Sequence, residues 1–90
     1  MTIINKTYLS LSKLPKLNKY NVTHLYINNN NLTNIDNLPD TLIYLNCGCN
    51  FIKTLDYLPF QLETLICSFN QITSLDYLPC NLKYLDCSHN

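Results

Sequence analysis

Apolar and polar positions recur with a period of twenty residues along most of this chain. A pair of leucines, a Leu-Pro step, a cysteine and an asparagine each return at a fixed place, and the unit reads L-x-x-L-x-C-x-x-N-x-I-x-x-L-D-Y-L-P-x-x. The units begin at residues 22, 42, 62 and 82. So many positions holding one period indicate a repeat architecture, in which each unit buries its apolar edge only against its neighbours.

Each unit contains an apolar–polar–apolar alternation, as in residues 45–47, which predicts a short strand with one buried face. Stacked units would place these strands in a parallel sheet, about 4.8 Å apart. The segment that follows, such as residues 52–59, returns further apolar side chains to the same core. It is too short for a regular helix and contains a proline, so we expect turns and 3₁₀ segments there.

The unit resembles the leucine-rich-repeat family, whose core pattern is L-x-x-L-x-L-x-x-N/C-x-L. The resemblance covers residues 22–90. The twenty-residue length and the Leu-Pro step are similar to short repeats of bacterial effector proteins. The cysteine in the third apolar place and the asparagine-rich composition are closer to leucine-rich-repeat proteins of giant DNA viruses. The resemblance implies a solenoid with a short parallel β-sheet on its concave face and turns and 3₁₀ segments on its convex side.

Residues 1–21 depart from the period. Leu14-Pro15 echoes the Leu-Pro step, but Leu14 lies 24 residues before Leu38 rather than 20. We therefore expect a degenerate first turn that serves as an N-terminal cap, followed by repeats over residues 22–90, the last of which is incomplete.

Composition and charge narrow the possible partners. No apolar run approaches the roughly 18 residues of a transmembrane helix, and the first residues lack the apolar segment of a signal peptide. We expect a cytoplasmic protein without a membrane partner, in the host cytoplasm if the chain is viral. The net charge of zero argues against a nucleic-acid partner. The odd number of cysteines, without a secretion signal, argues against a disulfide framework.

The charges are nevertheless separated along the chain. The first 21 residues carry four lysines and no acid, whereas the remainder carries six acids and two lysines. The last unit reaches only Asn90, so the strand near Leu85 is expected to present an uncapped edge. One function class is therefore a truncated or self-assembling structural fragment that associates through this C-terminal edge, with the charges favouring head-to-tail contact.

Several residues have the chemistry of a catalytic or metal site. Ser68, Asp86 and His89 are the residue types of a hydrolase triad, but nothing in the sequence places them in that geometry. A single glycine excludes a glycine-rich phosphate loop. The cysteine column reads as small buried apolar residues, because a line of sulfurs one strand apart does not suit tetrahedral zinc. We expect no enzyme activity, metal or cofactor. The cysteines of this column are Cys47, Cys67 and Cys87.

The asparagine column is interpreted as structural. The resemblance places each side chain inside the bend after a strand, where an amide can both donate and accept hydrogen bonds. The residues are Asn30, Asn50, Asn70 and Asn90.

The remaining candidates are binding residues. In the family that the unit resembles, variable strand positions line the concave face and bind partners, and side-chain alternation points them away from the core. The expected partner is an unknown protein, for which tyrosine offers contact area and a hydroxyl. The alternative is that stacked side chains only strengthen the sheet through neighbour contacts. The candidate positions are His24, Tyr26, Tyr44, Asn46, Thr64, Ile66, Tyr84 and Asp86.

Overall fold

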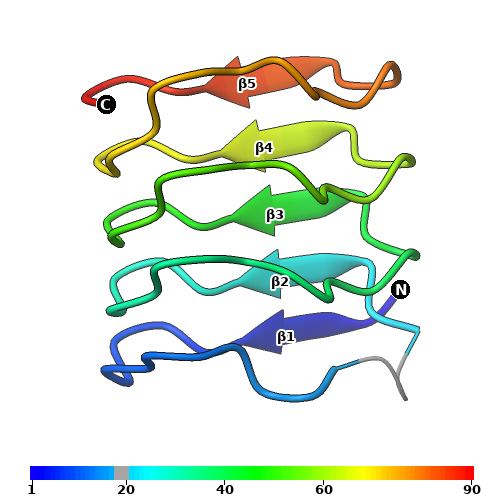
Figure 1. The fold of residues 1–90 in the computed structure, drawn as a ribbon. Helices are drawn as coiled ribbons and strands as arrows, with labels where there is room; N and C mark the ends of the chain where they lie inside the picture. Colours follow the sequence, from blue (N-terminus) through cyan, green and yellow to red (C-terminus); the bar gives the residue numbers. More distant parts are fainter. Residues whose placement is uncertain (18–20) are drawn as a thin grey trace.

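The computed structural model describes residues 1–17 and 21–90. Residues 18–20, which include Lys19 of the basic segment, lie outside the described part. Five strands of three residues form one parallel sheet, in the order in which they occur in the sequence (Figure 1). They are β1 (Ile3–Asn5), β2 (His24–Tyr26), β3 (Tyr44–Asn46), β4 (Thr64–Ile66) and β5 (Tyr84–Asp86).

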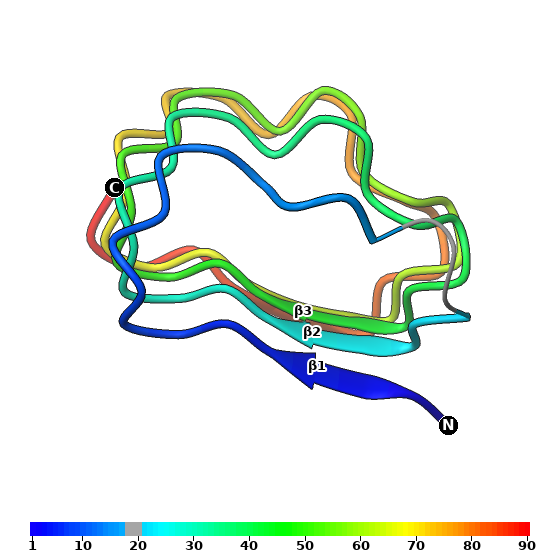
Figure 2. The same ribbon diagram turned by 90° about the horizontal axis from the view of Figure 1, so that it is seen from below.

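The chain winds as a parallel β-solenoid, as the twenty-residue period predicts. After each strand it bends, returns along the opposite side and enters the next strand. Viewed along the stack, the turns nearly superpose, with the strands on one side and the return segments on the other (Figure 2). Residues 1–17 and 21–90 contain no helix, and so no segment of helix that could span a membrane.

The register of the sheet follows the repeat. Leu45 pairs with Leu65, and Leu65 with Leu85, at the predicted spacing of twenty residues. In the first turn, Ile4 pairs with Leu25 at a spacing of 21. The segment expected to be a degenerate cap therefore contains a strand, β1, that the sequence analysis did not identify.

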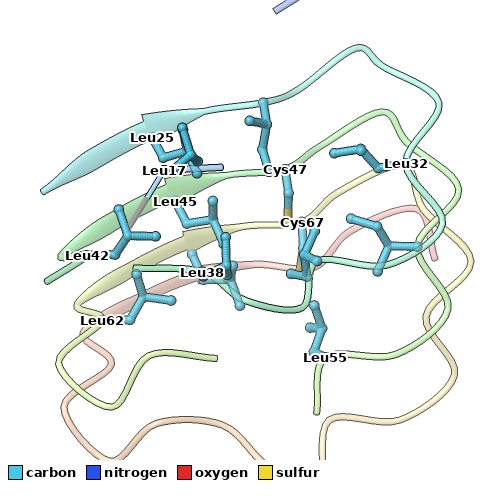
Figure 3. Close-up of a cluster of buried hydrophobic side chains, with 14 of the residues drawn as sticks. Leu17, Leu25, Leu32, Leu38, Leu42, Leu45, Cys47, Leu55, Leu62 and Cys67 are labelled. Atoms are coloured by element: carbon cyan, nitrogen blue, oxygen red, sulfur yellow. The ribbon is translucent and has the colours of Figure 1, made fainter. Parts of the chain in front are cut away.

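The core lies between the strands and the return segments (Figure 3). Leu45, Leu65, Cys47 and Cys67 have no exposed surface, and the return segment brings Leu55 against them with 5% exposed. A fully buried leucine contributes about 1.5–3 kcal/mol of hydrophobic free energy. Since each turn supplies only a few such residues, stability depends on the stacking of neighbouring turns.

The bend after each strand contains a non-glycine residue with a left-handed backbone, a conformation that an L-residue adopts at some cost. In the two middle turns these residues are Cys49, with φ of 54°, and Phe69, with φ of 56°. The same column continues with Asn29 and His89.

The asparagine after this residue ties the bend to the preceding turn. The Asn50 Nδ2 amide donates to the carbonyls of Ile27 and Cys47, both at 3.1 Å. Its Oδ1 atom accepts from the Leu32 N–H at 3.0 Å. The same arrangement recurs at Asn70 and Asn90. Each amide thus satisfies backbone groups of two successive turns, which offsets the cost of the bend.

The first asparagine of the column follows the same principle with different partners. The Nδ2 amide of Asn30 donates to the Lys6 carbonyl at 2.8 Å, and its Oδ1 atom accepts from the N–H groups of Leu9 and Leu11. This ties the first turn to the second, although the first turn has no asparagine of its own in the column.

The return segments consist of turns, as expected, but the expectation of 3₁₀ segments is wrong for the described residues. In the third turn, the Leu62 N–H donates to the Pro59 carbonyl at 3.2 Å, which is a single i to i+3 bond. Equivalent single bonds join Leu42 to Pro39 and Leu82 to Pro79. A 3₁₀ helix requires consecutive bonds of this kind, whereas here the chain continues directly into the next strand.

Candidate binding surface on the strands

The outward side chains of the strands form two columns. The central residue of each strand, such as Leu45, points into the core, so the residues on either side of it point outward. We call the surface of these two columns the strand face. The first column consists of Ile3, His24, Tyr44, Thr64 and Tyr84. The second column consists of Asn5, Tyr26, Asn46, Ile66 and Asp86.

The strand face brings together all eight binding residues predicted from the sequence. It also adds two that the sequence analysis missed, Ile3 and Asn5. Ile3 pairs with His24 and is 54% exposed, so it extends the first column by one strand. The alternating run of residues 3–5 was the available signal, but its spacing of 21 from the next strand concealed it.

Three aromatic rings pack together at one end of the strand face. The ring of Tyr44 stacks on His24 with centroids 5.6 Å apart and planes 14° apart. It also contacts Tyr26, at 5.1 Å with a tilt of 40°. Tyr44 is half-buried as a result, and this burial, together with the adjacent Tyr26 hydroxyl, raises the pKa of Tyr44. Its phenol therefore stays neutral near pH 7 and can donate a hydrogen bond.

The other end of the strand face is more open and carries a charge. Tyr84 is 57% exposed. The carboxylate of Asp86 accepts hydrogen bonds from the hydroxyl of Ser88 at 2.7 Å and from its N–H at 3.1 Å. These bonds lower the pKa of Asp86, because they favour the ionised form.

Polar groups border the two columns. His24 Nδ1 lies 2.9 Å from the Thr23 hydroxyl. Lys83 and Glu63 form an exposed ion pair at 3.5 Å, a contact that contributes about 0–1 kcal/mol. The strand face therefore offers aromatic area, hydroxyl and amide groups and one carboxylate, a set suited to recognition by contact and hydrogen bonding.

The residues considered for catalysis are engaged elsewhere. Asp86 bonds to Ser88, and the His89 ring stacks on Phe69 with centroids 4.2 Å apart and planes 10° apart. Ser68 supplies its carbonyl to the Asn70 amide at 3.2 Å. Within residues 1–17 and 21–90, no group of three histidine, cysteine or acidic side chains is placed to hold a metal ion.

All five cysteines are free thiols. Cys47 and Cys67 are fully buried, and Cys87 of the last turn is half-buried. Burial raises the pKa of Cys47 strongly and that of Cys67 to about 12. These thiols therefore remain protonated near neutral pH, whereas the thiolate is the metal ligand and the nucleophile.

Neither protein-family models nor curated proteins give a match to this chain.

Proposed function

We propose that this chain is a non-enzymatic interaction module that binds a protein partner across the strand face. The observation that carries this proposal is the continuity of the two outward columns over five parallel strands. Their aromatic members lie side by side, with the Tyr44 ring in contact with both His24 and Tyr26. Clustered exposed apolar and aromatic surface is typical of interaction sites, and tyrosine is enriched there.

We further propose that the solenoid is of the leucine-rich-repeat type, with a relationship to the short repeats of viral proteins. The repeat pattern supports this assignment, as does the hydrogen bonding of Asn50 and Asn70 inside the bends that follow their strands. In that family the strand side is the side that binds partners, which agrees with the surface proposed here.

The competing interpretation is that the outward residues only strengthen the sheet. Cross-strand contacts such as the Tyr44 stack contribute about 0.2–1 kcal/mol each, so they do serve the fold. They do not account for Tyr84 and Ile3, which are more than half exposed at the two ends of the first column. A surface that also binds a partner accounts for both groups.

The experiment is affinity capture with the immobilised chain from a lysate of the source cell, followed by quantitative binding of the recovered partner. The test variant is Tyr44→Ser/Tyr84→Ser, which removes both tyrosines of the first column. We expect binding to weaken at least tenfold, because interface tyrosines are frequent hot spots worth about 2 kcal/mol or more. Circular dichroism and thermal unfolding establish that the variant retains the fold.

The matched control is Tyr57→Ser/Tyr77→Ser, which removes two tyrosines from the return segments. These side chains are 72% and 69% exposed, so their loss perturbs the core little. The control should bind normally. Normal binding by a folded test variant, or equal losses in the two double variants, would contradict the assignment of the strand face.

A further inference from the structure

The two ends of the solenoid differ in how they terminate the sheet. In the central turns, Leu45 and Cys47 have no exposed surface, whereas their equivalents in the last turn, Leu85 and Cys87, are only half-buried. A hollow of about 290 Å³ lies beside them, with Ile72 among the residues that line it. The C-terminal end therefore exposes core side chains.

The N-terminal end carries a charge at the equivalent place. Because Ile4 pairs with Leu25, Lys6 occupies the position that Ile27 and Cys47 occupy in the next two turns. The backbone agrees, since the Lys6 N–H donates to the Tyr26 carbonyl as the Cys47 N–H donates to the Ile66 carbonyl. Lys6 is exposed at the end of the stack. A further turn placed on this end would bury the ammonium group, and a charge in an inward position is a known protection of edge strands.

This difference argues against head-to-tail stacking, in which β1 of one copy would pair with β5 of another. Such stacking would set Lys6 against Cys87 within a shared core. The separation of basic and acidic residues along the sequence favours that orientation only at long range, where salt screens it. Burying an unpaired ammonium costs more than such long-range attraction returns.

The backbone of β5 can instead pair with a second copy of itself. The Tyr84 N–H donates to the Glu63 carbonyl, and the Asp86 carbonyl accepts from the Cys67 N–H, so residues 84 and 86 face β4. The alternate residues face away from β4. The outward backbone groups are thus the N–H and carbonyl of Leu85, the N–H of Cys87 and the carbonyl of Lys83.

An antiparallel arrangement centred on Leu85 uses all of these groups. The two Leu85 residues exchange both backbone bonds, and each Cys87 N–H donates to the Lys83 carbonyl of the second copy. Antiparallel edge strands related by a two-fold axis form an isologous interface, which closes at two copies.

The side chains fit the same arrangement. On the strand face, Tyr84 of each copy stands opposite Asp86 of the other, so the phenol can donate to the carboxylate and Lys83 lies nearby. On the core side, the two Leu85 side chains meet. The rotation exchanges the ends of the strand and thereby sets Leu82 of the second copy over the hollow beside Cys87.

We propose that two copies of this chain associate through antiparallel pairing of their β5 strands, and that Lys6 prevents further addition at the other end. The strand faces of both copies then form one continuous surface. The association does not depend on the proposed partner, and each proposal can fail without the other.

The test is the mass of the 90-residue chain in solution, measured by light scattering and sedimentation in reducing buffer from about 1 to about 100 μM, the range that resolves micromolar affinities. The mass should rise with concentration from 10.5 kDa to twice that value and no further. Reducing conditions exclude disulfide-linked species. A strict monomer at the highest concentration, or growth beyond two copies, would overturn the proposal.

Two substitutions in the same core column test the mechanism. Cys87→Lys gives the C-terminal end the protection that Lys6 gives the other end, and should yield a monomer at every concentration. Cys80→Lys, at an exposed thiol outside β5, is the matched control and should still dimerise. Lys6→Ile removes the protection and should allow masses above that of the dimer. A dimeric Cys87→Lys variant would exclude β5 as the interface, and a Lys6→Ile variant that stops at two copies would exclude the role of Lys6.

Amide hydrogen exchange tests the unmodified chain, so the proposal stays falsifiable if a variant fails to fold. The N–H groups of Leu85 and Cys87 should become protected as concentration rises, while that of Ile3, on the outer edge of β1, should not change. Concentration-dependent protection at Ile3 instead would indicate head-to-tail stacking and refute the two-fold pairing.

Discussion

Replacement of Asn50 by aspartate separates a structural asparagine from one that is merely polar. The Asn50 side chain is 5% exposed, and its Nδ2 amide lies 3.1 Å from the Ile27 and Cys47 carbonyls and 3.2 Å from that of Gly48. In Asn50→Asp an acceptor oxygen replaces this donor. The carboxylate would face carbonyl oxygens in a buried site, while the Leu32 N–H could still donate to its other oxygen.

The magnitude follows from these contacts. An unsatisfied buried polar group costs about 1–3 kcal/mol, and a lost hydrogen bond about 0.5–1.5 kcal/mol. We expect Asn50→Asp to destabilise the fold by about 1–3 kcal/mol more than the control substitution Asn46→Asp. In a domain of this size that difference lowers the melting temperature by roughly 4–20 °C.

The control has a specific structural basis. The Oδ1 atom of Asn46 accepts from the Gly48 N–H at 3.1 Å, a role that a carboxylate fills equally well. Asp86 already fills it at the equivalent place of the last turn, where it accepts from the Ser88 N–H. Asn46→Asp should therefore be nearly neutral.

The assay is thermal and urea unfolding, followed by circular dichroism at pH 7 and at pH 4. The penalty of Asn50→Asp should shrink at the lower pH, because a protonated carboxyl group regains one donor. Equal unfolding midpoints for the two variants at pH 7 would refute the assignment of the asparagine column as structural.

Three further predictions concern the titration and reactivity of single side chains. Under native conditions Cys47 should react with a thiol reagent far more slowly than the exposed Cys80, because it is buried and its pKa is raised; comparable labelling rates by mass spectrometry would contradict this. Ser88→Ala should raise the pKa of Asp86 in an NMR titration, and it should remove stability that is present above the pKa of an unfolded aspartate and lost as pH falls through the folded value. Because the pKa of Tyr44 is raised, its absorbance change should follow that of an exposed tyrosine at higher pH, and its ionisation should destabilise the fold only above about pH 10; a Tyr44→Phe variant that keeps the late step would reassign it.

The repeated part of the fold could be predicted because the same side chain returns to the same environment. Leu45 and Leu65 mark the inward position of each strand, and Asn50 and Asn70 mark each bend, so the period of twenty residues determined both strand direction and register. A parallel stack was the arrangement in which each apolar column could be buried.

The first turn could not be predicted in the same way. Ile4 lies 21 residues before Leu25, and Lys6 replaces the apolar residue that marks the column elsewhere. A charged residue is tolerated there because the end of the stack is exposed to water. The physical condition that permits Lys6 thus removes the sequence signal by which β1 would have been recognised.

Details of the strand face also lay beyond the sequence pattern. Alternation indicates which side of the sheet Tyr44 faces, but not that its ring packs between His24 and Tyr26 and becomes half-buried. Similarly, the proline of each return segment predicted a turn, whereas the number of consecutive i to i+3 bonds depends on how soon the next strand begins.

Site-specific photo-crosslinking tests the role of the strand face most directly. A photoreactive phenylalanine derivative is introduced at Ile66, a half-exposed position of the second column, and in a second variant at Tyr77 on a return segment. Both variants are irradiated with the partner recovered by affinity capture. Binding across the strand face predicts an efficient crosslink from position 66 and little or none from position 77. Crosslinking from position 77 alone, by variants that bind the partner equally well, would contradict it.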